Sequence, residues 1–130
     1  MARILLIDDD DGVRTVLCAL LVRSGHTVFE ARDGEEGLDL FPRTGPDLVI
    51  TDIVMPKKSG LEVVQVLRAK QPGVKIIAMS GGGGGGPGDN LHAARQVGAT
   101  SVLVKPFAPT VLLAAVNGVL AAGTARRVIG

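Results

Sequence analysis

The sequence of 130 residues has a single cysteine, no long apolar run and almost no excess of either charge. The lone Cys18 excludes an intramolecular disulfide, and its apolar neighbours favour a buried structural thiol over a nucleophile. No apolar stretch approaches the roughly 18 residues that a membrane-spanning helix requires. The formal net charge of +1 gives no electrostatic attraction toward nucleic acid or an anionic membrane. We therefore expect a protein of the reducing cytoplasm that binds neither of them directly.

Short apolar runs alternate along the chain with segments whose apolar residues recur at helical spacing. The runs predict five strands, at about residues 4–7, 27–31, 48–52, 74–79 and 101–104. A helical pattern follows each strand. We expect the second helix to be ended by Pro42 and Gly45-Pro46, and the fourth helix to run from about Leu91 to Val97. Strands that alternate with helices predict right-handed βαβ crossovers and a parallel sheet. The predicted fold class is α/β, a doubly wound (βα)5 sandwich of three layers.

The same pattern places the boundaries of the folded unit. Residues 1–122 are expected to form one domain, because the chain is long enough for one substantial core and no linker is visible. Residues 123–130 lack periodicity, and we expect a flexible C-terminal tail there. The chain leads straight from Arg3 into a strand-like run that ends in acids, so we expect no signal peptide.

Polar side chains stand where four of the predicted strands end. Asp8 and Asp9 follow the first strand, and Asp52 lies at the end of the third. Ser80 ends the fourth strand and Lys105 the fifth. The carboxyl ends of parallel strands share one edge of the sheet, where ligands bind, so these side chains are expected to converge. Asp52 considered alone would be interpreted as a turn residue that caps the next segment. The expected convergence of polar side chains from four strand ends favours a functional site instead.

Three carboxylates in contact repel one another by roughly 1 kcal/mol per pair in water, and by several times that in a drier site. A hard cation would offset this repulsion, and a ligand set of oxygen atoms without histidine or thiolate indicates Mg²⁺. A carboxylate, a metal ion and the ammonium of Lys105 around one point suit phosphoryl transfer. Asp52 is the expected nucleophile, and its product would be an aspartyl phosphate.

Four short motifs carry this constellation. They are Ile-Asp-Asp-Asp at 7–10, Thr-Asp-Ile-Val-Met-Pro at 51–56, Met-Ser-Gly at 79–81 and Val-Lys-Pro-Phe at 104–107. With these motifs in this order, the sequence resembles the receiver domain of two-component response regulators, of the small chemotaxis-regulator type. The resemblance extends from Ile4 to about Leu120. It implies a flavodoxin-like fold with strand order 2-1-3-4-5.

The resemblance also implies a function. Asp52 would accept a phosphoryl group from a sensor histidine kinase or a histidine phosphotransfer protein. The protein would then be a phosphorelay signalling switch, without an output domain of its own, and not an enzyme beyond its own phosphorylation and autodephosphorylation. It would bind an unknown downstream protein, as a monomer or as a weak dimer that depends on phosphorylation.

The resemblance assigns roles to the site residues as well. Asp9 and Asp52 would be direct Mg²⁺ ligands together with the main-chain carbonyl of Val54, and Asp8 would act mostly through water. The hydroxyl of Ser80 would turn toward the phosphate. Lys105 would pair with the phosphate, and its peptide bond to Pro106 would be cis.

Two features depart from the family pattern. An aromatic residue usually stands three positions before the lysine and reports phosphorylation to partners, whereas this chain has Val102 there and no tyrosine or tryptophan. The run Gly81–Gly86 is the second departure, and we hypothesise that it orders around the phosphate. A glycine run satisfies a dinucleotide fingerprint trivially, and it follows the fourth strand here, so a nucleotide site is disfavoured.

Two other functions fit parts of the pattern. A Mg²⁺-dependent aspartyl-phosphate phosphatase or phosphotransferase would use the same nucleophile. Such enzymes usually have a second aspartate two residues later, where this chain has Val54, and this disfavours turnover. A binding module that works without phosphorylation is disfavoured by the complete set of acidic, hydroxyl and ammonium groups.

Overall fold

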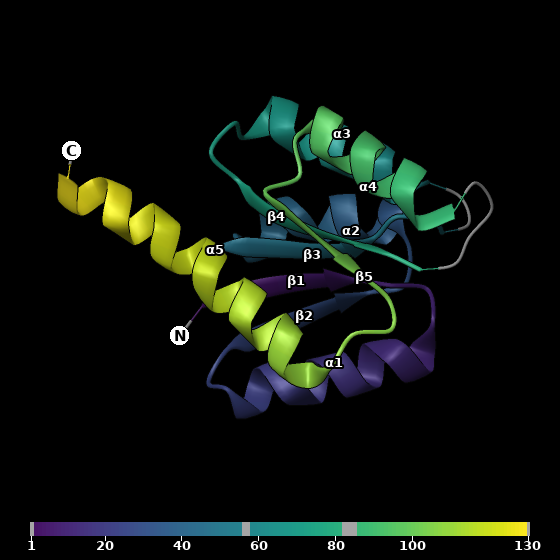
Figure 1. Cartoon of the computed structure of the whole chain (residues 1–130), viewed down its shortest axis with the longest axis horizontal. Helices are drawn as coiled ribbons and strands as arrows, with labels where there is room; N and C mark the ends of the chain where they lie inside the picture. The colour runs from purple at the N-terminus through teal and green to yellow at the C-terminus, as the bar shows by residue number, and fades with distance from the viewer. Residues whose placement is uncertain (1, 56–57, 82–85, 130) are drawn as a thin grey trace.

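The computed structural model describes residues 2–55, 58–81 and 86–129, and the side chains of residues 2–55, 58–81 and 92–121. In this part of the chain five strands alternate with five helices (Figure 1). The elements are β1 (Arg3–Ile7), α1 (Asp11–Arg23), β2 (Thr27–Ala31), α2 (Gly34–Thr44), β3 (Leu48–Asp52), α3 (Gly60–Lys70), β4 (Lys75–Ser80), α4 (Gly86–Val97), β5 (Ser101–Val104) and α5 (Pro109–Ile129). The strands are parallel and lie in the order β2-β1-β3-β4-β5. The predicted flavodoxin-like α/β fold is therefore confirmed.

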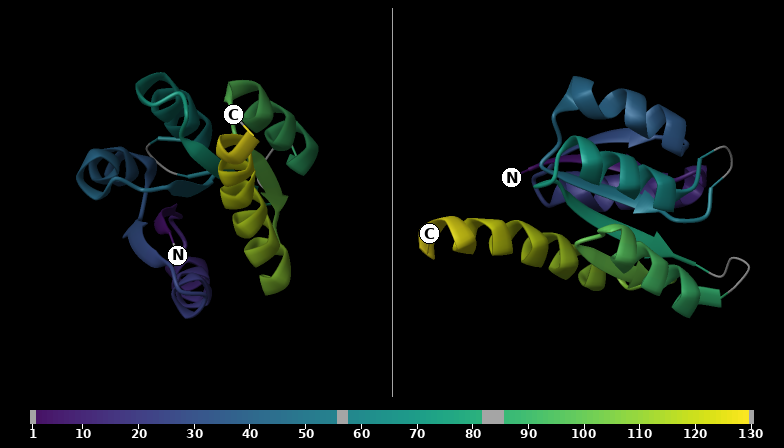
Figure 2. Two further views of the ribbon diagram at one scale, coloured as in Figure 1. Left: turned by 90° about the vertical axis from the view of Figure 1, so that its left-hand side faces the viewer. Right: turned by 90° about the horizontal axis from the view of Figure 1, so that it is seen from above.

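Helices cover both faces of the sheet (Figure 2). Alternate residues of β1 divide between the faces: Ile4 and Leu6 pack with α1 and α5, while Leu5 and Ile7 pack with α2 and α3. A smaller cluster joins Ala94 of α4 to Ala78 of β4 and to Ile53, which follows β3. Because the central strands are buried on both faces, their sequences are continuous apolar runs, which is the pattern that allowed their prediction.

Of the two signals predicted to end the second helix, Pro42 does not end it, whereas Gly45-Pro46 does. α2 continues through this proline to Thr44. Proline has no N–H to give to the carbonyl four residues earlier, but the loss occurs in the last turn, where the Thr44 hydroxyl donates to the Leu40 carbonyl at 2.9 Å. The helix ends instead at Gly45, whose left-handed φ of 56° lets its N–H donate to the Phe41 carbonyl.

The fourth helix begins earlier than predicted, at Gly86 and not near Leu91. The sequence Pro-Gly after the glycine run indicated a turn. A proline in the first turn of a helix is nevertheless tolerated, because the N–H groups there have no partner within the helix. The prediction was wrong because Pro87 is compatible with a helix start as well as with a turn.

The last helix continues past the expected domain boundary at residue 122. α5 extends to Ile129 and runs beyond the sheet (Figure 2). Lys75 at the start of β4 holds it, with Nζ 3.3 Å from the Leu120 carbonyl oxygen. Since the side chains after residue 121 are not described, the flexible tail at 123–130 stays a prediction. No helix in the described part of the chain combines the length and apolarity needed to cross a membrane.

We predict that Gly60→Ala strongly destabilises the fold. An added Cβ at Gly60 would lie 2.0 Å from the Asp52 carbonyl oxygen, so the start of α3 would have to move away from the end of β3. The expected loss is about 3 kcal/mol of unfolding free energy. Gly118→Ala in α5 is the control, because nothing lies within 4 Å of its added Cβ. It should stabilise by up to about 1 kcal/mol, and equal effects of both substitutions in urea unfolding followed by circular dichroism would contradict the prediction.

Candidate functional site

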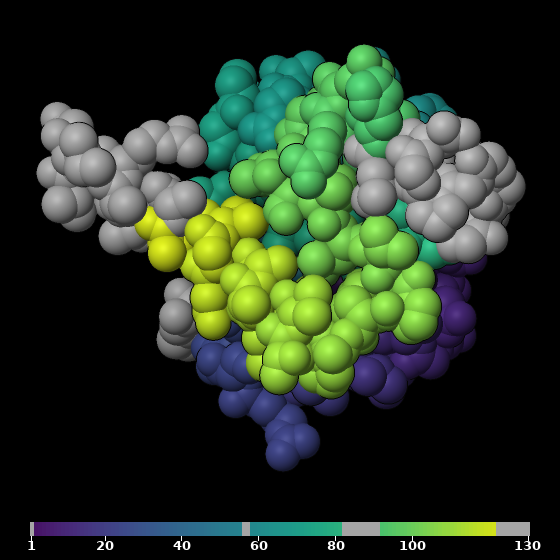
Figure 3. All heavy atoms as spheres, in the orientation of Figure 1, coloured from purple at the N-terminus to yellow at the C-terminus, as the bar shows by residue number. Residues whose placement is uncertain are grey.

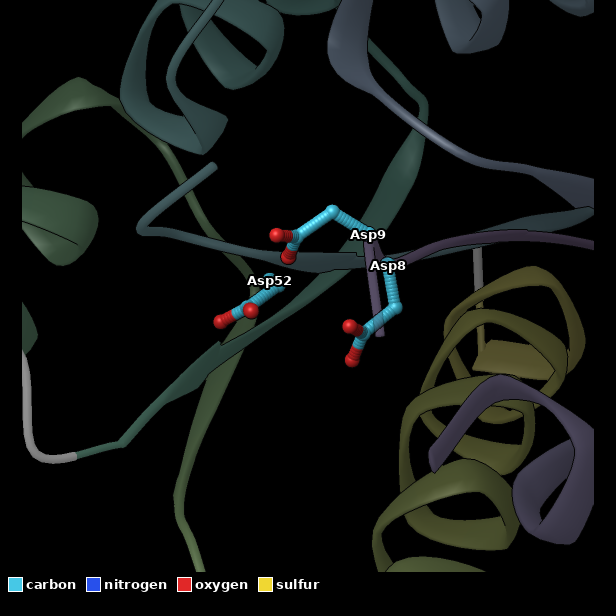
Figure 4. Close-up of side chains that lie close together, drawn as sticks. All are labelled: Asp8, Asp9 and Asp52. Atoms are coloured by element: carbon cyan, nitrogen blue, oxygen red, sulfur yellow. The ribbon is translucent and has the colours of Figure 1, made fainter. Parts of the chain in front are cut away.

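The acidic residues predicted to converge do so at the carboxyl edge of the sheet (Figure 4). β1 and β3 are neighbours, with Ile7 paired to Thr51, so the residues that follow lie side by side. Asp8, Asp9 and Asp52 each offer a carboxylate oxygen, and these atoms all lie within 4.8 Å of one another. Asp8 and Asp52 are buried and Asp9 is exposed. The arrangement is open to solvent on one side and could hold a divalent cation through oxygen ligands.

Lys105 brings a positive charge to the two buried carboxylates. Its Nζ lies 2.9 Å from Asp8 Oδ2 and 3.3 Å from Asp52 Oδ2. The backbone places it there, because the Lys105 N–H donates to the Ser80 carbonyl at 2.7 Å. An added Cβ at Gly81 would lie 2.9 Å from the Lys105 Cβ, so the side chain passes directly over this glycine. The peptide bond from Lys105 to Pro106 is cis, as the family resemblance implied.

Ser80 contributes a buried hydroxyl at the end of β4. The residue has no exposed surface, and its Oγ is the one buried side-chain polar atom without a hydrogen-bond partner in the described part of the chain. A buried polar group without a partner costs free energy. A ligand with acceptor oxygen atoms at this edge of the sheet would satisfy the hydroxyl.

The electrostatics of the site follow from burial and pairing. Burial raises the pKa of Asp52, and the charge of Asp8 adds to this effect, whereas Lys105 opposes both. Burial by itself would lower the pKa of Lys105, but Asp8 and Asp52 outweigh it and raise that pKa. The ammonium therefore stays charged at neutral pH. One cation faces two buried carboxylates and a third that is exposed, so the site keeps an excess of negative charge.

The remaining predicted positions lie around this centre. Val54 follows β3 and is 48% exposed. The ligand role of its main-chain carbonyl stays a prediction. Val102 is partly buried and packs against the cluster of Ile53, Ala78 and Ala94, so a small side chain occupies the position of the family's aromatic residue. In the run Gly81–Gly86, residues 82–85 lie outside the described part of the chain. The hypothesis that this run orders around the phosphate concerns these residues and stays a prediction.

Sequence reasoning missed two residues that build the site. Gly60 lets α3 begin against the backbone of β3, and Arg14 bonds the Asp8 carbonyl oxygen at 2.7 Å. A basic residue one turn after a run of acids is a signal that could have identified Arg14. Nothing in the local sequence distinguishes Gly60 from a glycine that simply follows a helix cap.

The sequence matches the family model of the response regulator receiver domain over residues 4–117. The chain belongs to this family. "Probable transcriptional regulator ycf27" of Porphyridium aerugineum is 39% identical over 120 residues, which are 91% of this chain and 48% of that protein. "Response regulator MprA" of Mycobacterium sp. (strain KMS) is 37% identical over 121 residues, 91% of this chain and 50% of that protein. This receiver domain thus spans about half the length of these relatives.

Solved receiver structures have the same architecture. A response regulator receiver domain protein from Clostridium thermocellum superposes with a TM-score of 0.88 at 32% identity, covering 95% of this chain and 98% of that one. Chemotaxis protein CheY4 of Vibrio cholerae superposes with a TM-score of 0.82 at 31% identity, covering 92% and 98%. The resemblance inferred from the four motifs is therefore confirmed for both family and fold.

We predict that Asp52→Asn stabilises the metal-free receiver domain at neutral pH. A raised carboxyl pKa means that ionisation disfavours the folded state, and this cost develops as pH rises from the ordinary value of 3.8 through the raised folded value. At neutral pH the variant should gain on the order of 1 kcal/mol of unfolding free energy. The gain should shrink as the pH is lowered toward 3.8.

Urea unfolding in the presence of a chelator measures the difference in unfolding free energy between Asp52→Asn and the wild type. The pH should range from roughly 8 to roughly 4, because acid unfolding is avoided there. The control is Asp39→Asn, which removes the same charge from an exposed pair with Arg43. A constant difference between Asp52→Asn and the wild type at all pH values would contradict the assignment.

Proposed function

We propose that this receiver domain accepts a phosphoryl group on Asp52 in a Mg²⁺-dependent reaction and thereby switches partner binding or relays the phosphate. The observation that carries the proposal is the position of Lys105, which bridges Asp8 and Asp52, two of the three clustered carboxylates. Oxygen ligands without nitrogen or sulfur fit Mg²⁺. Asp9, Asp52 and the Val54 carbonyl are the proposed direct ligands, with Asp8 mostly acting through water.

The carboxylate of Asp52 is held in place before a donor arrives. The N–H of Ile53 donates to its Oδ1 at 2.9 Å, and Lys105 faces its Oδ2. In the proposed step an oxygen of Asp52 forms a bond to phosphorus while the bond between phosphorus and the donor histidine nitrogen breaks. The imidazole leaves with the electron pair and then takes up a proton. Bound Mg²⁺ would supply charge neutralisation at the phosphoryl oxygen atoms.

Two side chains are available to hold the transferred group. The hydroxyl of Ser80 has no partner and would donate to a phosphoryl oxygen. Lys105 already carries its charge to Asp52 and would pair with another oxygen of the group. The hydrogen bond from Ser80 would form only in the phosphorylated state. It would therefore stabilise that state relative to the unphosphorylated one, and this supports a switch.

A phosphodonor has an apolar surface available beside the site. A groove of about 690 Å³ lies between α1 and the segment after β5, and it adjoins Lys105. Its apolar lining includes Val13 and Val16 from α1 and Phe107, and Val16 is 59% exposed. This supports docking of a sensor histidine kinase or a histidine phosphotransfer protein through an apolar surface next to its phosphohistidine.

The downstream surface is proposed to be α4, β5 and α5, which together form one face of the molecule (Figure 3). Val104 and Val111 expose apolar side chains there. Val102 would take the place of an aromatic reporter, because it packs with Ala94 of α4 and lies on the strand that precedes Lys105. The downstream protein, the oligomeric state and the cytoplasmic location stay predictions from the sequence.

The alternative of a Mg²⁺-dependent phosphatase or phosphotransferase is less well supported. Such an enzyme needs an acid or base two residues after the nucleophile, and the side chain at that position is the apolar Val54. We propose that the chemistry of this domain is limited to its own phosphorylation and autodephosphorylation.

The proposed function predicts one phosphoryl adduct on Asp52. The chain should be incubated with acetyl phosphate and Mg²⁺ and its intact mass measured, with Asp39→Asn as the charge-matched control. The wild type and Asp39→Asn should gain a single phosphoryl group, and Asp52→Asn should gain none. Turnover of the donor without an adduct would favour the phosphatase, and no reaction would favour a binding module that works without phosphorylation.

We further predict that Ser80→Ala separates stability from chemistry. Removing a buried hydroxyl without a partner should leave the unfolding free energy unchanged or raise it by up to about 1 kcal/mol. The same substitution should slow phosphorylation by acetyl phosphate about tenfold or more, because a donor to the phosphoryl group is lost. The rate of adduct formation by intact mass tests this, and an unchanged rate would exclude a role for the hydroxyl in transfer.

A further inference from the structure

Arg14 of α1 places a largely buried guanidinium against the segment that joins β1 to α1. Its side chain is 11% exposed. Its Nη1 donates to the main-chain carbonyl of Asp8 at 2.7 Å, and its Nε donates to Glu30 of β2 at 3.2 Å. The other terminal nitrogen bonds the Asp11 carboxylate. One side chain therefore connects the end of β1, the first turn of α1 and the edge strand.

The segment that Arg14 contacts carries the exposed acid of the site. The N–H of Asp8 donates to the Ala31 carbonyl at 3.1 Å, so with Arg14 both main-chain groups of Asp8 are bonded. The N–H of Asp10 donates to Asp8 Oδ1 at 2.9 Å. Asp9 lies between these two fixed residues, and its exposed side chain has little packing of its own to hold it in place.

We propose that Arg14 is a positioning residue that holds the segment Asp8–Asp10 in the geometry that binds a divalent cation. Without the guanidinium the Asp8 carbonyl loses its partner, and Asp9 is free to leave the cluster with Asp52. Groups that orient metal ligands typically change metal affinity by about 10-fold to 100-fold when they are removed. This inference rests on the proposed Mg²⁺ site and adds a residue that lies outside the four motifs.

Because Arg14 is positively charged, the direction of the change in Mg²⁺ affinity on its removal tests the inference. A guanidinium close to a cation site repels the cation, so if Arg14 acted through its charge alone, its removal would strengthen Mg²⁺ binding. If Arg14 acts by positioning, its removal weakens binding. The two explanations predict changes in opposite directions.

The test is the Mg²⁺ dissociation constant of the full chain, measured by titration calorimetry without a phosphodonor. Arg14→Met should raise it about tenfold. Arg14→Lys keeps the charge and one donor for the Asp8 carbonyl, and should raise it by less. Arg23→Met is the matched control, because it removes the same charge from an exposed position in the last turn of the same helix. It should bind Mg²⁺ as the wild type does or slightly more tightly.

A second measurement separates positioning from a general loss of structure. In Arg14→Met, phosphorylation by acetyl phosphate should require a higher Mg²⁺ concentration for its half-maximal rate. At saturating Mg²⁺ the rate should reach the wild-type maximum. If the wild type binds Mg²⁺ and Arg14→Met binds it equally well or more tightly, the positioning role of Arg14 is overturned while the proposed Mg²⁺ site stands. If Arg14→Met does not fold, unchanged affinity in Arg14→Lys overturns it. Absence of Mg²⁺ binding by the wild type would overturn the metal site and this inference with it.

Discussion

The structure depends on charge compensation at the carboxyl edge of the sheet. Asp8 and Asp52 are buried beside each other, and burial raises the pKa of Asp52. Lys105 contacts both carboxylates, and Ile53 donates its N–H to one of them. The compensation is incomplete, because Asp9 adds a third negative charge on the open side. This remaining negative charge is what the proposed Mg²⁺ would neutralise.

The same edge of the sheet also contains a polar group without a hydrogen-bond partner. Ser80 is fully buried and its hydroxyl has no partner, although buried polar groups in folded proteins nearly always have one. Two glycines allow close approach at this edge, since Gly60 contacts the end of β3 and Gly81 lies under the side chain of Lys105. A site with a buried hydroxyl that lacks a partner suits a ligand that brings acceptor oxygen atoms. The proposed phosphorylation of Asp52 would bring such atoms.

Two errors of the sequence-based prediction, at the end of α2 and at the start of α4, have a common cause. Pro42 and Pro87 were both taken as signals against a helix, but the effect of a proline depends on where in the helix it stands. Near either end the missing N–H removes little, and packing against the sheet outweighs the local preference. Cys18 was expected to be a buried structural thiol. It is partly buried and packs against the core cluster that contains Leu17 and Leu21, and burial raises the pKa of its thiol.

The sequence by itself determined the strands, their parallel arrangement and the identity of the residues at their ends. These follow from local features: apolar runs, their alternation with helical segments, and the requirement that parallel strands end at one edge. Which charges meet was decided only by the tertiary structure. Arg14 bonding the Asp8 carbonyl, and Lys105 lying between two acids, depend on the register of the strands and on the course of the connecting segments. Side-chain distances of a few ångströms follow from those features, and no local pattern in the sequence encodes them.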